Sequence, residues 1–292
     1  NFNSNSETEL SEGDYKKEAN KITWISKGDG DNNGLTITDI KEGTYILKET
    51  IAPDGYTIAT EIEFTVNSDG TITIGKESIT DRIITVEDNI SRIEISKKEI
   101  NGTSELPGAI LTLTKTGNFT TEQISKVEEA TDNRSIIFKS NGITWTSGTE
   151  PVILNQLPDG NYTLTETTAP DGYAIAETIT FEVGPDGKVT SNGSELEDNT
   201  LIMTDEINKV SISKQDINDK KELAGAKLEI TQINENGDKV TDGFTKSWTS
   251  TDTPMLIEKI PAGFYKLTET IAPDGYTIAT EIEFTVNSDG TI

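Results

Sequence analysis

Apolar and polar residues alternate along most of this chain, in short runs separated by turn residues. Such runs begin at Ile93 (IEISK), Tyr162 (YTLTE), Ile179 (ITFEV) and Leu201 (LIMTD). A period of two is typical of half-buried β-strands, and Pro-Asp-Gly and Ser-Asp-Gly triplets supply turns between them. We therefore predict an all-β fold of tandem β-sandwich domains. Two polar stretches, 8–19 and 123–130, are interpreted as short helices or loops.

The chain contains three copies of one sequence repeat. Residues 49–72 recur letter for letter at 269–292, and a diverged copy begins at Glu166. A second motif, RIEISKKEI…ELPGAILTLT from Arg92, recurs as KVSISKQDI…ELAGAKLEIT from Lys209. Recurrence at this scale indicates repeated structural units. The predicted domains are a first repeat without its opening strand, a complete middle repeat and a third repeat without its last strand: 1–90, 91–208 and 209–292. We expect the chain to be an excerpt of a longer protein rather than halves completed by another chain.

Three ionisable side chains continue the apolar faces of predicted strands in the middle repeat. They are Lys97, Glu166 and Asp205, each two residues beyond the last apolar residue of its face. Side chains two apart in a strand share a face, so all three are expected to point into the sandwich. The first repeat has Glu49 and Asp88 at the matching positions, and the Glu-to-Asp spacing is the same.

The third repeat carries Lys214 and Glu269 in the same phase. A partner lysine for Asp88 and a partner acid for Lys214 would lie outside this chain. The matching positions predict that every repeat follows one design, of which the middle repeat alone holds all three groups here.

Burial gives this combination a specific chemistry. Desolvation lowers the pKa of an amine and raises that of a carboxyl group, so both approach their neutral, reactive forms. A neutral lysine could then attack a protonated Asp205, with Glu166 polarising the carboxyl group and moving protons as water leaves. The product would be an amide made once by the chain on itself. A buried salt-bridged trio is the alternative, although such a trio is costly unless well paired.

Composition narrows the function classes. The 292 residues contain no cysteine and no histidine, which excludes disulfides, thiol nucleophiles and His-dependent triads. The net charge of −26, from 51 acidic and 25 basic residues, argues against nucleic acid and anionic membranes as partners. We expect no cofactor, no metal, no membrane insertion and no turnover of a separate substrate.

The motifs ISKKEI…ELPGA, YTLTETTAPDGY and LIMTDE resemble the Cna B-type (SpaA-like, prealbumin-like) domains of Gram-positive adhesins and pilins. The resemblance covers essentially the whole chain and implies tandem Ig-like or prealbumin-like sandwiches. It implies that Lys97 and Lys214 are amide-forming lysines, with Asp88 and Asp205 as acceptors. The isopeptide-promoting glutamates would be Glu49, Glu166 and Glu269.

The resemblance also implies a place and a role. The chain is expected to be an extracellular, cell-wall-anchored stalk or shaft segment, cross-linked by Lys–Asp isopeptide bonds that resist tension and proteolysis. Expected partners are neighbouring repeats of the same chain, other pilin or adhesin subunits, or a host surface ligand. The alternative is a ligand-binding adhesin domain for a host matrix protein or a glycan.

Two further features are candidate binding sites. Asp29–Gly34 begins like a calcium loop of the D-x-D-x-N-G type, but Ile40 stands where the last acidic ligand would be, so a turn is favoured. Tryptophans precede the same hairpin in each repeat, at Trp24, Trp145 and Trp248. They could form a glycan-binding platform, but their shared position favours packing in the core or between domains.

Overall fold

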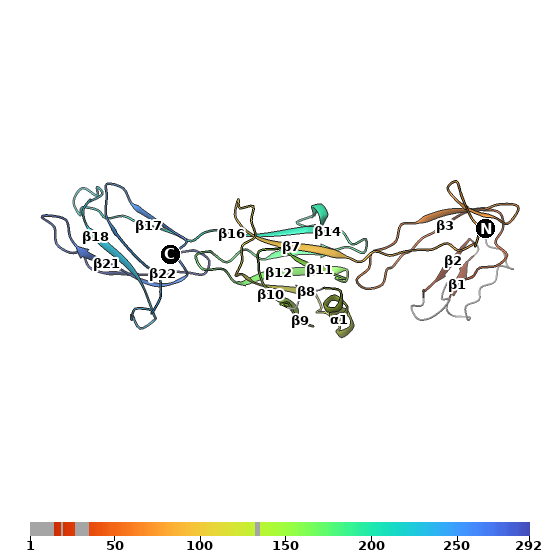
Figure 1. Ribbon diagram of the computed structural model, residues 1–292, viewed down its shortest axis with the longest axis horizontal. Coiled ribbons are helices and arrows are strands. Elements are labelled where there is room, and N and C mark those ends of the chain that lie inside the picture. Colours follow the sequence, from red (N-terminus) through yellow and green to blue (C-terminus); the bar gives the residue numbers. More distant parts are fainter. Residues whose placement is uncertain (1–14, 19, 27–34, 132–134) are drawn as a thin grey trace. The chain divides into compact units, whose positions relative to one another are not determined.

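The computed structural model describes residues 15–18, 20–26, 35–131 and 135–292 (Figure 1). The chain divides into two compact units, one comprising 1–52 with 58–89 and the other 53–57 with 90–292. Among the described residues the structure is built of strands, with one α-helix and one short 3-10 helix. The predicted all-β class is confirmed.

The first unit contains a hairpin and a four-stranded antiparallel sheet. The hairpin pairs β1 (Tyr15–Glu18) with β2 (Lys21–Trp24). The sheet has the order β3-β4-β5-β6, with bounds Gly43–Leu47, Ile62–Val66, Ile72–Ile74 and Glu77–Ile79. Residues 15–18 are therefore a strand, although the polar composition of 8–19 predicted a helix or loop. The rest of that stretch, residues 8–14 and 19, lies outside the described residues.

The middle repeat is a sandwich of two sheets. The smaller sheet has the order β11-β7-β16, and the larger has the order β15-β14-β13-β12-β8-β10-β9. The smaller sheet is formed by β7 (Arg92–Glu99), β11 (Val152–Asn155) and β16 (Thr200–Asp205). The larger sheet is formed by β8 (Ile110–Lys115), β9 (Ile137–Lys139), β10 (Gly142–Thr146), β12 (Gly160–Thr168), β13 (Ile179–Val183), β14 (Val189–Ser191) and β15 (Ser194–Glu195).

One hydrophobic core lies between these sheets. Ile93 and Met203 of the smaller sheet belong to the same buried cluster as Leu113 and Leu164 of the larger. Trp145 of β10 is also in this cluster and is 3% exposed. This position supports core packing rather than a glycan platform for Trp145.

The helix α1 (Thr121–Ala130) packs against this core through its buried face. Thr120 and Gln123 form a capping box, and Ile124 and Val127 are the buried residues of the helix. The polar stretch at 123–130 is thus helical. A 3-10 turn at Glu197–Asn199 leads into β16.

The third repeat is a smaller sandwich in the same unit. It pairs β17 (Lys209–Ile212) with β20 (Met255–Glu258), and its second sheet has the order β19-β18-β21-β22. The bounds of that sheet are β18 (Lys227–Ile233), β19 (Thr245–Thr249), β21 (Gly263–Ile271) and β22 (Ile282–Val286). Trp248 packs partly buried against this core.

Asn208 lies where the middle and third repeats meet within the second unit. It is 1% exposed, and its backbone N–H donates to Gly172 O at 2.8 Å. Its side-chain amide donates to Ile260 O at 3.1 Å, and its carbonyl accepts from Lys259 N at 2.8 Å. The two repeats therefore follow each other directly, and one buried residue contacts both.

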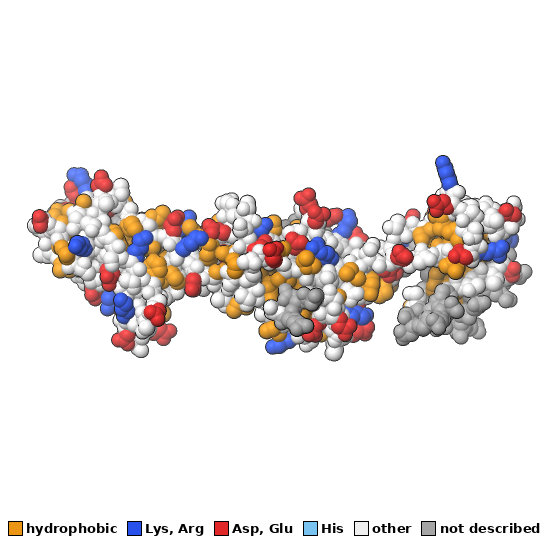
Figure 2. All heavy atoms as spheres, viewed as in Figure 1, with side chains coloured by type: hydrophobic (Ala, Val, Ile, Leu, Met, Phe, Trp, Pro, Cys, Tyr) orange, Lys and Arg blue, Asp and Glu red, His pale blue; other side chains and the backbone are white. Residues whose placement is uncertain are grey.

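The surface carries much of the acidic charge. Figure 2 shows Asp and Glu side chains scattered over the visible face among fewer Lys and Arg side chains. Across the described residues, no helix has the length and apolar character needed to cross a bilayer.

Candidate functional site: a buried lysine between two carboxylates

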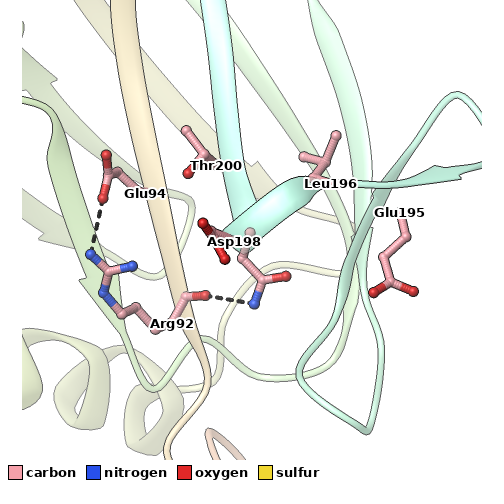
Figure 3. A pocket seen from close by; sticks show the side chains of 7 residues that line it. Arg92, Glu94, Glu195, Leu196, Asp198 and Thr200 are labelled. Atoms are coloured by element: carbon pink, nitrogen blue, oxygen red, sulfur yellow. Dashed lines mark hydrogen bonds and ion pairs between the residues drawn. The ribbon is translucent and has the colours of Figure 1, made fainter.

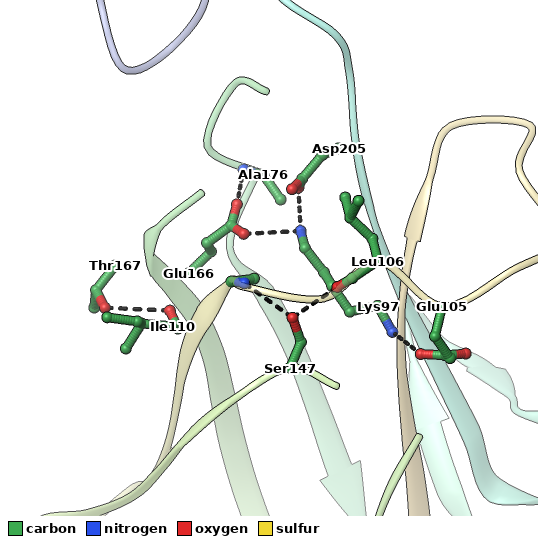
Figure 4. A network of polar contacts seen from close by, with 10 residues as sticks. Lys97, Glu105, Leu106, Ile110, Ser147, Glu166, Thr167, Ala176 and Asp205 are labelled. Atoms are coloured by element: carbon green, nitrogen blue, oxygen red, sulfur yellow. Dashed lines mark hydrogen bonds and ion pairs between the residues drawn. The ribbon is translucent and has the colours of Figure 1, made fainter. Parts of the chain in front are cut away.

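Lys97, Glu166 and Asp205 come together inside the middle repeat (Figure 4). Lys97 lies on β7 and Asp205 on β16, while Glu166 reaches them from β12 of the facing sheet. The side chains of all three are at most 1% exposed. The alternation of the sequence thus places three ionisable groups in a core where water is excluded.

Parallel pairing of β16 with β7 brings Asp205 to the lysine. The register places Met203 opposite Lys97 and Asp205 opposite Glu99, so Asp205 lies two residues farther along, on the lysine's face. Lys97 Nζ contacts Asp205 Oδ1. Because side chains on neighbouring strands lean along the strand direction, this diagonal brings amine and carboxyl group together.

Glu166 is held from its other side. Its Oε2 accepts a hydrogen bond from Ala176 N at 2.6 Å, and its Oε1 lies 3.1 Å from Lys97 Nζ. The register of β12 against β8 shifts between Glu166 and Thr168, which marks a β-bulge. Bulges re-aim side chains next to functional sites, and this one lies at the glutamate that faces the lysine.

The electrostatics favour a neutral acceptor. Burial raises the pKa of the Asp205 carboxyl group to about 7, against the lowering effect of the hydrogen bond from Lys97. Asp205 Oδ2 is buried without a hydrogen-bond partner among the described residues, and the polar contact of Glu166 Oε1 among them is its ion pair with Lys97. Buried oxygens in this situation are costly, so the ionised trio is not fully satisfied as a salt bridge.

The third repeat contains two of the three groups. Lys214 Nζ lies 3.1 Å from Glu269 Oε1, and Glu269 Oε2 accepts from Ala279 N at 2.5 Å. The Lys214 side chain is 16% exposed. Within the described residues, no acidic group takes the place of Asp205 there.

The first repeat differs more. Glu49 is half-buried and accepts from Ala59 N at 2.7 Å, as its two counterparts do from their alanines. Residues 84–88 form no strand, so the predicted strand ending at Asp88 is wrong for this structure. Val86 is 40% exposed and Asp88 is half-buried. In the middle repeat the equivalent segment is a strand because β7 pairs with it, and no such partner is present among the described residues of the first unit.

Other candidate sites add little. The possible calcium loop at Asp29–Gly34 lies outside the described residues, and in the remainder no group of three or more acidic residues could hold a metal ion. A surface hollow lies at the start of β7, where Arg92 forms an ion pair with Glu94 at 3.0 Å (Figure 3). Its mixed charges suggest no particular chemistry, and it is separated from Lys97 by most of the length of β7.

Sequence reasoning missed the contacts of Glu105. This residue accepts hydrogen bonds from Lys97 N at 2.9 Å and from Ser96 Oγ at 2.5 Å. The signal was present in the sequence, since an acid follows the lysine at the same spacing in both complete motifs, at Glu105 and Glu222.

Three comparisons with known proteins bear on this site. A family model, described as the SpaA prealbumin-like fold domain, matches residues 4–79, 91–195 and 208–292. No curated protein matches the chain. The predicted domain boundaries lie near these matched ranges but remain a prediction.

Solved structures resemble the chain weakly. The Bacillus anthracis TIE protein is 23% identical with a TM-score of 0.34, over 89% of this chain and 42% of that protein. A C-terminal fragment of the pilus adhesin SpaC from Lactobacillus rhamnosus GG is 21% identical with a TM-score of 0.36, over 69% of this chain and 84% of the fragment. A streptococcal ancillary pilin is 18% identical with a TM-score of 0.30, over 88% of this chain and 75% of the pilin. Likeness at this level carries no argument about function.

Proposed function

Because this chain belongs to the family of SpaA prealbumin-like fold domains, we propose that it is a stalk or shaft segment of a Gram-positive surface adhesin or pilus. In this proposal each complete repeat is cross-linked by an amide between its lysine and its aspartate, and the segment is extracellular and anchored to the cell wall. The chain acts on itself once and turns over no substrate. The contact of Lys97 with Asp205 in a dry core, beside Glu166, carries the proposal.

The reaction balances as a condensation. The neutral amine of Lys97 attacks Asp205 Cγ, a C–N bond forms, and a C–O bond of the carboxyl group breaks to release one water. Glu166 takes a proton from the attacking nitrogen and returns a proton to the departing oxygen, so it ends unchanged. Burial favours the protonated form of Asp205, because it raises the pKa of that carboxyl group. The same dry core would protect the amide from hydrolysis.

The position of the cross-link suits a tensile role. Lys97 is near the entry of the middle repeat and Asp205 near its exit, so the amide would close a loop of 108 residues. The chain-entropy model assigns about 4 to 5 kcal/mol to closing a loop of that length. Tension would pass from β7 to β16 through the covalent bond and bypass the strands in between.

The decisive measurement is the intact mass of the purified 292-residue chain. The proposal expects the loss of one water, located by tandem mass spectrometry to a branched peptide containing Lys97 and Asp205. Lys97→Ala should restore the full mass. A wild-type chain with the full calculated mass would overturn the cross-link.

The stalk role needs a separate mechanical test. When the chain is pulled from both ends, the loop between Lys97 and Asp205 should not extend in the wild type. In Lys97→Ala the same loop should be released as roughly 350 Å of additional length, from its 108 residues at about 3.3 Å each. Equal extension of the two proteins would contradict the load-bearing role.

A further inference from the structure

The carboxylate of Glu105 holds the backbone of the strand that carries the lysine. Strand β11 pairs with β7 as far as Ile95 and does not reach Lys97. The segment beginning at Glu105 takes its place at this edge: Leu106 N donates to Lys97 O at 2.6 Å, and Glu105 Oε2 accepts from Lys97 N at 2.9 Å. Both backbone polar groups of Lys97 are therefore held by two consecutive residues.

The second oxygen of Glu105 fixes the neighbouring residue. Glu105 Oε1 accepts from Ser96 Oγ at 2.5 Å, and Ser96 is 2% exposed. Hydrogen bonds to an ionised carboxylate are about twice as strong as neutral ones. One side chain thus uses both of its oxygens on residues 96 and 97, without touching the amine of the lysine.

The segment that carries Glu105 is itself anchored. Ser147 Oγ donates to Leu106 O at 2.7 Å and accepts from Ala109 N at 2.9 Å. Figure 4 shows this sequence of contacts, from Ser147 through Leu106 and Glu105 to Lys97. Ser147 directly follows β10 of the larger sheet, which also carries Glu166. These hydrogen bonds therefore connect the strand of Lys97 to the sheet of Glu166.

The third repeat has the same arrangement without an acceptor strand. Glu222 Oε2 accepts from Lys214 N at 3.2 Å, Glu222 Oε1 accepts from Ser213 Oγ, and Leu223 N donates to Lys214 O at 2.7 Å. In the described residues, β17 has β20 as its one strand partner. The carboxylate contact therefore does not depend on the strand that would bring the acceptor.

We propose that Glu105 is a positioning residue for amide formation in the middle repeat, and that Glu222 has the same role for Lys214. The inference rests on the proposed function. Glu105 fixes the backbone at Lys97, and with it the direction of the Cα–Cβ bond, before Asp205 arrives. The long lysine side chain then has fewer conformations to search, and small errors in reacting geometry are costly in rate.

The test follows the rate of water loss in the full 292-residue chain. The chain is made by cell-free synthesis, samples are quenched in denaturant at intervals, and the fraction lacking one water is read from the intact mass. Glu105→Ala is expected to slow the reaction roughly tenfold or more. Glu105→Gln should be intermediate, since its amide oxygen can still accept one of the two hydrogen bonds.

Glu222→Ala is the matched control. It makes the same chemical change on the same kind of segment, but in the repeat that has no acceptor, so the rate at Lys97 should equal that of the wild type. A slowing by Glu222→Ala equal to that by Glu105→Ala would overturn the inference, because the effect would then not be local.

A positioning role must also be separated from loss of folding. The Lys97 amide proton, hydrogen-bonded to a carboxylate, should resonate downfield in a ¹⁵N-labelled Glu166→Gln chain and move upfield when Glu105→Ala is added. Circular dichroism of the same pair measures the folded fraction. The inference is supported if Glu105→Ala lowers the rate of water loss by a larger factor than it lowers the folded fraction. It is overturned if the rate is unchanged, or if it falls by the same factor as the folded fraction. If the wild type and Glu222→Ala both keep their full mass, the proposed function itself fails and this inference falls with it.

Discussion

The middle and third repeats share one scaffold but differ at the lysine. Strand β7 has 8 residues and is paired on both sides, whereas β17 has 4 residues and ends at Ile212, before its lysine. The side chain of Lys97 is 1% exposed and that of Lys214 is 16% exposed. Yet Glu166 and Glu269 are held alike, by backbone N–H groups of Ala176 and Ala279.

This comparison separates two requirements of the site. The glutamate and the lysine backbone reach their places through contacts within the hairpins and the segments starting at Glu105 and Glu222. Complete burial of the lysine coincides with the parallel strand β16, which also brings the acceptor. The acceptor strand therefore supplies both the electrophile and the last part of the dry environment.

Replacing the lysine should give the largest difference in stability loss between the middle and third repeats. We expect Lys97→Ala to lower the free energy of unfolding of the middle repeat by at least the roughly 4 to 5 kcal/mol of the lost cross-link. It also leaves Asp205 and Glu166 buried without a counter-charge. Differential scanning calorimetry should show one transition moving strongly downward.

Lys214→Ala is the control for that experiment. It breaks the equivalent ion pair with Glu269 but no cross-link, so a smaller loss is expected in the third repeat. Equal losses in the two repeats would mean that ion pairing alone explains the stability of the middle repeat.

Replacing the glutamate by glutamine should remove its ability to transfer protons while keeping its size and its hydrogen bond. Glu166→Gln keeps an oxygen for the hydrogen bond from Ala176 but cannot shuttle protons, so the mass should rise by one water relative to the cross-linked chain. The loss of stability should approach the roughly 4 to 5 kcal/mol of the cross-link. Glu269→Gln should leave the number of waters lost unchanged. A Glu166→Gln chain that still loses water would show that the glutamate is dispensable.

The raised pKa of Asp205 predicts a pH dependence in chains that cannot cross-link. The pKa of this carboxyl group rises from 3.8 to about 7 on burial, so the folded state binds its proton more tightly than the unfolded state. The resulting stabilisation is complete below about pH 4 and is lost as the pH rises through about 7. In Lys97→Ala, which also lacks the lysine that opposes the shift, the melting temperature of the middle repeat should fall over this range.

A double variant isolates the responsible group. Lys97→Ala/Asp205→Asn has no titrating acceptor, so its melting temperature should fall less between pH 4 and pH 7 than that of Lys97→Ala. Identical pH profiles would assign the dependence to other carboxyl groups. Melting curves of the two proteins in the same buffers provide the measurement.

The sequence predicted those features that depend on alternation. Ile93, Ile95 and Lys97 share a buried face, as the period of two requires, and so do the residues that lead to Glu166 and Asp205. The repeated hairpins also made the placement of Glu269 predictable from that of Glu166. These features follow from local backbone geometry.

Features that need a distant partner could not be predicted from the pattern. Residues 84–88 have strand-like alternation but form no strand, since alternation does not supply the neighbouring strand that completes the hydrogen bonds. Tyr15–Glu18 is polar but pairs with Lys21–Trp24. The role of Glu105 depends on where β11 ends, and periodicity carries no information on that.

The smallest expected effect concerns two equivalent serines, and it tests whether the middle and third repeats are stabilised by the same contacts. Ser147 and Ser250 are both 7% exposed, and each accepts from an alanine N–H at 2.9 Å and donates to a leucine carbonyl at 2.7 Å. Replacing either serine by alanine leaves a buried donor and a buried acceptor unpaired, at a cost of about 1 to 3 kcal/mol. Denaturant unfolding should give the same loss in both repeats, because neither serine contacts the acceptor strand. A much larger loss of unfolding free energy for Ser147→Ala would show that the acceptor strand also stabilises the segment that holds Glu105, and not the lysine alone.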